Sequence, residues 1–157
     1  MKKILVLNGP NFNPPGSGEP ARHGHATLAD VEGLCRAAGA RLGCEVECVQ
    51  SNSEGVLIDK IHEYGRLFQA GKALGCVLNP GSLAHTSMAL HDAIEGVDGL
   101  PVIECRISNA HAGEAVPQPS LISPVAAGIV AGFGVHCYVI ALEGLVHTRS
   151  RGSARHP

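Results

Sequence analysis

Residues 27–50, TLADVEGLCRAAGARLGCEVECVQ, place a helical pattern directly before a strand pattern. Thr27 is a favourable N-cap, and Gly43 follows the last apolar position of the helical part. Apolar and polar residues then alternate over 45–50, as they do in a strand. The apolar positions of the helical part recur at helical spacing and share one face: Leu28, Val31, Leu34, Cys35, Ala38 and Leu42.

The same alternation of strand and helix continues on both sides of this stretch. Four further strands are predicted at residues 3–7, 76–79, 101–108 and 126–133. Further helices are predicted at residues 54–69, 87–94 and 136–145. Short connections between alternating strands and helices indicate a parallel sheet with helices on both faces. The expected fold is an α/β, flavodoxin-like, doubly wound five-stranded parallel sheet.

The chain of 157 residues has the length of one ordinary domain. No repeat or break in composition divides it, so we expect one domain over 1–146. The end of the chain, 147–157, is rich in Gly, Ser and Arg and is expected to be a disordered tail. A basic contact patch is the alternative interpretation of this tail.

Composition also bears on partners and compartment. A net charge of −2 and an aromatic content of 3% give no reason to expect nucleic acid or an anionic membrane as partner. The start, MKKILVLNGP, lacks the apolar length of a secretory signal, and no apolar run is long enough to cross a bilayer. The six cysteines form no Cys-x-x-Cys pair, so we expect buried free thiols in a reducing cytoplasm.

Polar residues follow four of the predicted strands, at 8–13, 51–52, 79–85 and 106–109. Ligands of such sheets bind at the carboxyl ends of the strands. Amides, hydroxyls, a histidine and an arginine would meet there, which suits a hydroxylated or anionic small molecule. Two of these segments, Asn8-Gly9-Pro10-Asn11 and Asn79-Pro80-Gly81, also have an ordinary interpretation as turns. Arg106 is harder to explain in that way, because an arginine that closes an apolar strand must reach water or an anion.

Two other kinds of site are not favoured by the sequence. No two histidines have the i,i+4 spacing of a helical metal site, and His23 and His25 lie in a glycine-rich loop without further ligands nearby. We therefore expect no metal. The glycines near the first strand fit neither the dinucleotide-binding nor the Walker spacing, which argues against a phosphate loop.

Several motifs, in uninterrupted order from Lys3 to about Leu145, together resemble the type II 3-dehydroquinate dehydratases. The resemblance implies an enzyme without a cofactor that removes water from a cyclic 3-keto polyhydroxy carboxylate through an enolate, in the shikimate pathway or in quinate catabolism. In that family a lid tyrosine beside an arginine takes the proton, and a histidine protonates the departing hydroxyl. The segments that carry the resemblance are LNGPNFN (7–13), QSNSEG (50–55), LNPGSLAHTSMALHDA (78–93), VIECRISNAHAGE (102–114) and LISPVAAGIVAGFG (121–134).

This chain departs from the family pattern where protons are handled. The family lid reads Arg-Glu-Pro-x-x-Tyr-Gly, and here Gly18 stands in place of the arginine and His23 in place of the tyrosine. Arg106 stands in place of the acid histidine. The arginine that follows the family's His-Ala motif has no counterpart near residues 113–117. A guanidinium stays protonated and is a poor general acid, whereas His23 titrates near neutral pH and can act as a base.

The resemblance then assigns site residues to this sequence. His23, Asn11 and Arg106 are expected to take part in catalysis. Asp92 corresponds to a contact across subunits, which implies a homo-oligomer, namely a dodecamer built from trimers. We expect either a bound anion beside Arg106 or Glu104 as its counter-charge. The expected substrate-binding residues are Asn79, His85, Asp92, Glu104, Ile107 and Ser108.

Three functions remain open from the sequence. The first is dehydration in the manner of the family, with His23 as base and Asn11 polarising the enolate through a water molecule. The second is a related lyase or isomerase that acts on another small carboxylate held by Arg106. The third is a non-catalytic relative that binds a quinate-like or shikimate-like ligand.

Overall fold

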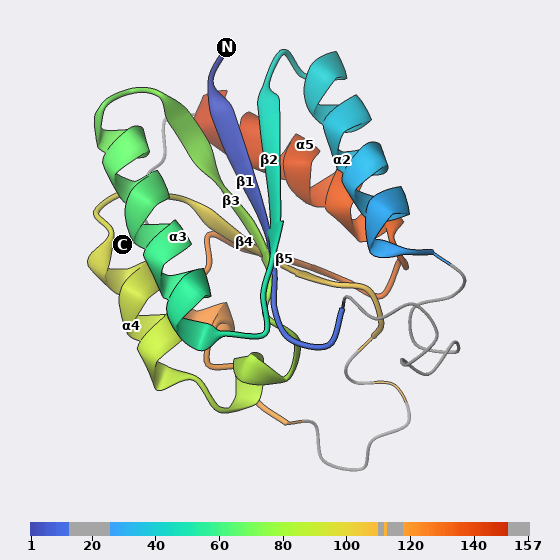
Figure 1. Ribbon diagram of the computed structural model, residues 1–157, viewed down its shortest axis with the longest axis vertical. Coiled ribbons are helices and arrows are strands. Elements are labelled where there is room, and N and C mark those ends of the chain that lie inside the picture. Colours follow the sequence, from blue (N-terminus) through green and yellow to red (C-terminus); the bar gives the residue numbers. More distant parts are fainter. Residues whose placement is uncertain (13–25, 110–111, 113–117, 151–157) are drawn as a thin grey trace.

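The computed structural model describes residues 1–12, 26–109, 112 and 118–150. The strands are β1 (Lys3–Asn8), β2 (Glu45–Gln50), β3 (Ala73–Asn79), β4 (Val102–Arg106) and β5 (Gly128–Ala131). They pair in parallel in the order β2-β1-β3-β4-β5 and form one sheet (Figure 1). The predicted five-stranded, doubly wound parallel sheet is confirmed.

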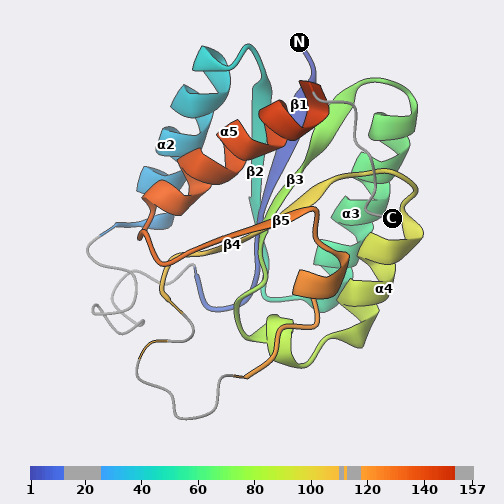
Figure 2. The same cartoon turned by 180° about the vertical axis from the view of Figure 1, so that it is seen from behind.

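Helices cover both faces of this sheet. The long helices are α2 (Leu28–Arg41), α3 (Glu54–Gln69), α4 (Met88–Gly96) and α5 (His136–Ser150). Figure 1 shows α3 and α4 together on one face, and Figure 2 shows α2 and α5 together on the other. Two short 3-10 turns, Gly81–His85 and Ser123–Val125, were not predicted from the sequence. None of the described helices is both long and apolar enough to cross a membrane.

Local sequence signals explain where α2 begins and ends. The Thr27 side chain accepts a hydrogen bond from the Asp30 N–H, and the Asp30 carboxylate accepts one from the Thr27 N–H. This capping box satisfies two backbone donors that the helix itself leaves unpaired. After the C-cap, Gly43 has a φ of 74°, a left-handed conformation that glycine adopts without steric cost.

The core consists of two apolar layers, one on each side of the sheet. In β1, Ile4 and Val6 pack with α2 and α5, whereas Leu5 and Leu7 pack with α3 and α4. All four side chains are fully buried. A strand that is covered on both faces needs apolar residues at every position, which is why KILVL is a continuous apolar run.

Several boundaries differ from the sequence prediction. Strand β3 begins at Ala73, three residues earlier than predicted, because Ala73 already pairs with Lys3 of β1. Strand β4 ends at Arg106, whereas the prediction extended to residue 108. Helix α5 runs to Ser150, so the predicted tail boundary at residue 147 was too early; Val146 still packs against the core, and no Gly or Pro interrupts residues 145–150. Residues 151–157 lie outside the described part of the chain.

The topology brings the ends of β1, β3 and β4 together. The chain leaves β1 toward β2 and later returns to the other side of β1 as β3, so the sheet reverses its order between these two strands. Such a switch point opens the edge of the sheet at the carboxyl ends, where ligands of this fold class bind. Asn8 and Asn79, the last residues of β1 and β3, are directly paired there.

Candidate active site

A very close backbone approach joins the segments that follow β1 and β3. The Gly9 N–H donates to the Asn79 carbonyl at 2.8 Å. A Cβ atom at Gly9 would lie 2.5 Å from the Pro80 carbonyl oxygen, which is closer than real Cβ contacts allow. Only glycine permits this approach, so Gly9 fixes the relative position of the two segments.

The segment after β1 is held in an uncommon conformation. Asn11 has a φ of 68° and is the one non-glycine residue with positive φ among the described residues. Its N–H donates to Asn52 Oδ1 at 3.1 Å. Gln50 Nε2 donates to the same Oδ1 at 3.2 Å and to the Gly9 carbonyl at 3.1 Å. The end of β2 therefore fixes Asn11 at the edge of the sheet, and backbone strain of this kind is common at functional sites.

Asn79, predicted to bind substrate, is oriented by two contacts. Its Oδ1 accepts a hydrogen bond from the Gly81 N–H at 3.2 Å, and its Nδ2 donates to the Tyr138 hydroxyl at 3.0 Å. The Tyr138 hydroxyl in turn donates to Asn8 Oδ1 at 2.5 Å. Asn8 is only 1% exposed. Burial raises the pKa of Tyr138 well above its ordinary value, so the phenol stays protonated and acts as a donor.

Arg106, at the end of β4, shares Gly81 as a hydrogen-bond partner with Asn79. Its Nη2 donates to the Gly81 carbonyl at 3.4 Å, and the N–H of the same Gly81 binds Asn79. The Arg106 side chain is 15% exposed, and its Nε lies 3.9 Å from Glu104 Oε1. Neither contact uses Nη1.

Glu104 is a buried carboxylate, only 1% exposed. Ser120 Oγ donates to Oε1 at 2.8 Å, and Ser123 Oγ donates to Oε2 at 2.7 Å. Ser120 Oγ also accepts the backbone N–H groups of Ile122 and Ser123, which strengthens it as a donor. Glu104 also lies within ion-pair distance of Arg106.

His85 stands at the end of the turn that follows β3. Its Nδ1 lies 3.1 Å from the Pro119 carbonyl oxygen. A carbonyl only accepts, so Nδ1 carries a proton and Nε2 of the neutral ring is an acceptor. The Leu121 N–H also donates to the Ala84 carbonyl at 2.7 Å, which ties residues 118–121 to this turn.

The remaining residues of the predicted site are placed differently. Ile107 is buried in the core and accepts a backbone hydrogen bond from Gly134 at 2.9 Å, while Ser108 beside it is exposed. Asp92 lies on α4, and 69% of its side chain is exposed. His23 and the rest of its loop lie outside the described residues.

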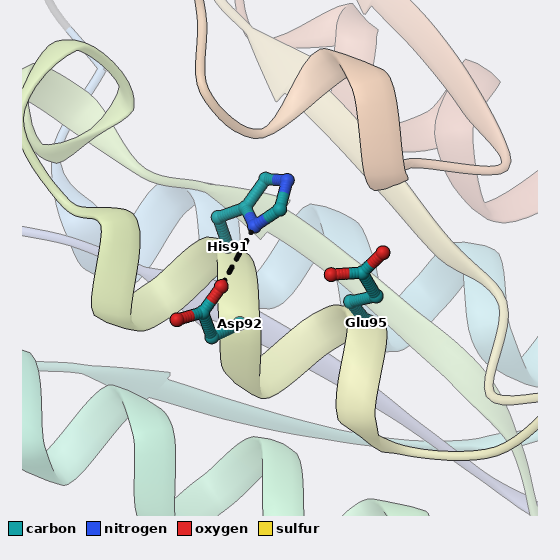
Figure 3. Close-up of side chains that lie close together, drawn as sticks. All are labelled: His91, Asp92 and Glu95. Atoms are coloured by element: carbon teal, nitrogen blue, oxygen red, sulfur yellow. Dashed lines mark hydrogen bonds and ion pairs between the residues drawn. The ribbon is translucent and has the colours of Figure 1, made fainter.

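A group of possible metal-ligating side chains occurs on α4. One ligand atom each of His91, Asp92 and Glu95 lies within 4.8 Å of the others, and His91 Nδ1 is 3.1 Å from Asp92 Oδ1 (Figure 3). Asp92 and Glu95 are exposed, and exposed acidic groups on a helix often gather in this way without an ion. The geometry therefore assigns no metal to this group.

Several residues of the site were not foreseen from the sequence. Tyr138 is the clearest of them, although a signal existed: the chain has only two tyrosines, and a tyrosine in a buried helix face needs a partner for its hydroxyl. The serines after residue 118 carried no comparable signal. The residues that sequence reasoning missed are Gln50, Ser120, Ser123 and Tyr138.

Comparisons with known proteins agree on one family. The sequence model described as "Dehydroquinase class II" matches residues 2–146. The chain is 61% identical to a 3-dehydroquinate dehydratase from Marinomonas sp. (strain MWYL1), with 94% of this chain and 97% of the relative covered. It is 60% identical to a 3-dehydroquinate dehydratase from Variovorax paradoxus (strain S110), with 93% and 99% covered.

Solved structures give the same result. The crystal structure of a type II dehydroquinase from Butyrivibrio crossotus DSM 2876 superposes with a TM-score of 0.83 at 37% identity. The superposition covers 92% of this chain and 97% of that chain. Sequence and fold therefore agree over nearly the whole described chain.

Proposed function

This chain belongs to the class II dehydroquinase family, and we propose that it removes water from 3-dehydroquinate or a closely related cyclic keto carboxylate. The observation that carries the proposal is the group of polar residues at the carboxyl ends of β1, β3 and β4. There Asn79 and Arg106 share Gly81 as a partner. Amides beside a guanidinium suit a ligand that carries both hydroxyls and a carboxylate.

In the proposed reaction, His23 removes a proton from the carbon next to the ketone. The electron pair of that C–H bond forms an enolate, which Asn11 polarises through a bound water molecule. The enolate then expels the hydroxyl on the adjacent carbon, and this hydroxyl takes a proton from solvent and leaves as water. His23 releases its proton to solvent, so no net proton is gained or lost. The product is a conjugated enone. Asn79, His85, Ile107 and Ser108 are proposed to hold the ring and its hydroxyls.

Arg106 is proposed as the anchor for the carboxylate or the enolate. Its guanidinium does not release a proton at working pH, so it does not serve as the acid of the second step. Glu104 is proposed to act through Arg106 rather than to contact substrate directly, because its oxygens already accept hydrogen bonds from Ser120 and Ser123. In this proposal Glu104 and Arg106 act together as one ion pair.

We further propose that the protein is a homo-oligomer, a dodecamer built from trimers, in which Asp92 reaches the site of a neighbouring subunit. The exposure of Asp92 supports this, since it is free to meet another chain. The proposed compartment is the cytoplasm, because all six cysteines are free thiols and five of them are buried. Light scattering tests the assembly, and a monomer at micromolar concentration would overturn it.

The central experiment is turnover of 3-dehydroquinate by the purified full-length protein, followed by ultraviolet absorbance of the enone and by mass spectrometry. His23→Ala is expected to lower kcat by about 10²-fold or more, the usual contribution of a general base. His25→Ala is the matched control in the same loop and is expected to keep activity. Equal activity in His23→Ala and wild type would remove His23 from the mechanism.

A second function is favoured by Arg106, which stands where the family has its acid. If the wild type binds 3-dehydroquinate without turnover, the chain is a ligand-binding relative or acts on another small carboxylate. A thermal-shift screen of small carboxylates then identifies the ligand. Arg106→His restores the family's acid and is expected to raise dehydration if only the acid is missing.

The anchor role of Arg106 has its own test. Arg106→Ala is expected to weaken carboxylate binding by about 2–3 kcal/mol, the value of a hydrogen bond to a charged group. Arg66→Ala, at an exposed arginine of α3, is the control and is expected to leave the affinity unchanged. Unchanged affinity in Arg106→Ala would overturn the anchor role.

A further inference from the structure

Tyr138 is a polar exception in the buried face of α5. Its neighbours on that face, such as Cys137, Ala141 and Leu142, are fully buried and apolar. The Tyr138 ring packs edge-to-face against Phe12, with centroids 6.5 Å apart and an interplanar angle of 82°. Phenylalanine would supply the same packing, so the hydroxyl calls for a separate explanation.

The hydroxyl occupies the middle of a hydrogen-bonded chain whose direction is fixed from one end. The backbone N–H of Gly81 only donates, so the Asn79 atom that faces it is Oδ1. Nδ2 then faces Tyr138 and donates to its oxygen, and the tyrosine proton is left for Asn8 Oδ1. The backbone N–H of Gly81 therefore determines the direction of each hydrogen bond in the series from Gly81 to Asn8.

These hydrogen bonds leave the Asn79 side chain with a defined capacity for further hydrogen bonds. An asparagine side chain has two N–H donors and two acceptor lone pairs. Gly81 uses one lone pair and Tyr138 uses one N–H, so among the described residues one of each remains. A substrate hydroxyl both accepts and donates, which matches this remaining pair.

We propose that Tyr138 is a positioning residue that holds the Asn79 amide in the orientation needed to bind a substrate hydroxyl, and that Asn8 holds Tyr138. The inference deepens the proposed function and rests on it for the identity of the ligand. Without the tyrosine oxygen, Asn79 Nδ2 loses its partner, and the Gly81 N–H alone holds the amide. Asn8 Oδ1 at the same time becomes a buried acceptor without its donor.

The test is a double-mutant cycle in kcat/KM for 3-dehydroquinate. Tyr138→Phe is expected to lower kcat/KM about tenfold, as expected when one net hydrogen bond is lost. In the Asn79→Ala background the same change is expected to have no further effect, because Tyr138 acts through Asn79. Tyr64→Phe is the matched control: it also removes a buried hydroxyl, and it is expected to leave kcat/KM unchanged in both backgrounds.

A merely structural role would lower stability in both tyrosine variants without this dependence on Asn79. Wild-type kcat/KM in Tyr138→Phe, or an equal loss with and without Asn79, overturns the proposal. Should Tyr138→Phe not fold, Asn8→Ala is the second variant. It removes the acceptor of the tyrosine proton and is expected to lower kcat/KM with the same dependence on Asn79.

A second readout separates this inference from the proposed function. The crystal structure of Tyr138→Phe without ligand is expected to show the Asn79 amide turned or in two orientations, while the backbone of residues 79–81 is unchanged. This result supports the positioning role even if the wild type does not turn over 3-dehydroquinate, in which case only the proposed function fails. An Asn79 amide that keeps its single wild-type orientation overturns the positioning role whatever the activity.

Discussion

Tyr64 and Tyr138 are both fully buried, yet their hydroxyls belong to different kinds of network. Tyr64 on α3 donates to Glu47 Oε2 at 2.6 Å, and Lys60 Nζ bridges Glu47 Oε1 at 2.8 Å and Glu63 at 3.0 Å. We call Glu47, Lys60, Glu63 and Tyr64 the Glu47 network. Tyr138 instead joins two neutral amides, Asn8 and Asn79, and we call these three residues the Tyr138 network.

The difference lies in what remains unsatisfied. In the Glu47 network, opposite charges satisfy one another: hydrogen bonds from Lys60 and Tyr64 lower the pKa of Glu47, and the bond to Glu47 raises the pKa of Lys60. In the Tyr138 network, the described part of the chain leaves Asn79 with one unused donor and one unused acceptor at the carboxyl end of a strand. A network closed by charge pairs stabilises the fold, whereas one that ends in a free amide at a switch point is available to a ligand.

The largest predicted effect is on the free energy of unfolding. It concerns the removal of one of two carboxylates: Glu104, which is buried near the Tyr138 network, or Glu47, which is partly exposed. Glu104→Ala is expected to reduce the free energy of unfolding by about 3–5 kcal/mol, because it leaves the Arg106 charge without its partner. Glu47→Ala is expected to cost about 1–2 kcal/mol, because that side chain is 34% exposed but the Tyr64 hydroxyl loses its acceptor. Urea unfolding at one fixed protein concentration measures both, and equal losses would remove the distinction between the two carboxylates.

The next effect concerns the backbone approach that aligns Asn8 with Asn79. Gly9→Ala is expected to destabilise the protein by about 1–3 kcal/mol, the usual cost of overpacking, and to lower activity with it. Its control is Gly33→Ala on α2, where an added Cβ would meet nothing within 4 Å. That control is expected to stabilise the helix by up to about 1 kcal/mol. A Gly9→Ala variant with wild-type stability and kcat/KM would contradict the close approach.

A smaller effect tests whether the Glu47 network is purely structural. Lys60→Met keeps the apolar part of the side chain and removes the charge, so it is expected to cost about 0.5–1 kcal/mol of stability. Because Lys60 lies on α3, at a distance from the strand ends, kcat/KM is expected to be unchanged. A specific loss of kcat/KM in Lys60→Met would show that the two networks are coupled.

The smallest effect is the pH dependence of the same network. The pKa of Glu47 is lowered in the folded protein, so its contribution is complete above its ordinary value of 4.5 and is lost as pH falls through the lowered pKa. The pKa of Lys60 is raised, so its contribution is complete below its ordinary value of 10.5 and is lost as pH rises through the raised pKa. The difference in unfolding free energy between wild type and Glu47→Gln is therefore expected to be largest between these values.

Urea midpoints of the two proteins across a pH series provide the measurement. Convergence of the midpoints in acid and in strong base is the expected result. A difference that stays constant from acid to base would mean that ionisation of Glu47 and Lys60 does not contribute to stability.

The sequence by itself determined the order and type of the main elements. Thr27 caps α2 through Asp30, three residues away, and the apolar spacing that follows identifies the buried face. The continuous run at 3–7 likewise identifies a strand covered on both sides. These signals are local, because capping and periodicity depend on residues a few positions apart. The position of Asn79 and Arg106 at neighbouring strand ends followed from the same pattern.

Only the tertiary structure decided which side chains complete the site. Tyr138 is 130 residues from Asn8 and 59 from Asn79, and it meets them because the first turn of α5 lies against the ends of β1 and β3. Glu104 likewise meets Ser120 and Ser123, which lie 16 and 19 residues further along the chain. The periodicity of a sequence specifies which face of an element is buried. The partner of a buried hydroxyl or carboxylate depends on how two distant elements cross, and this is decided by the packing of the whole core.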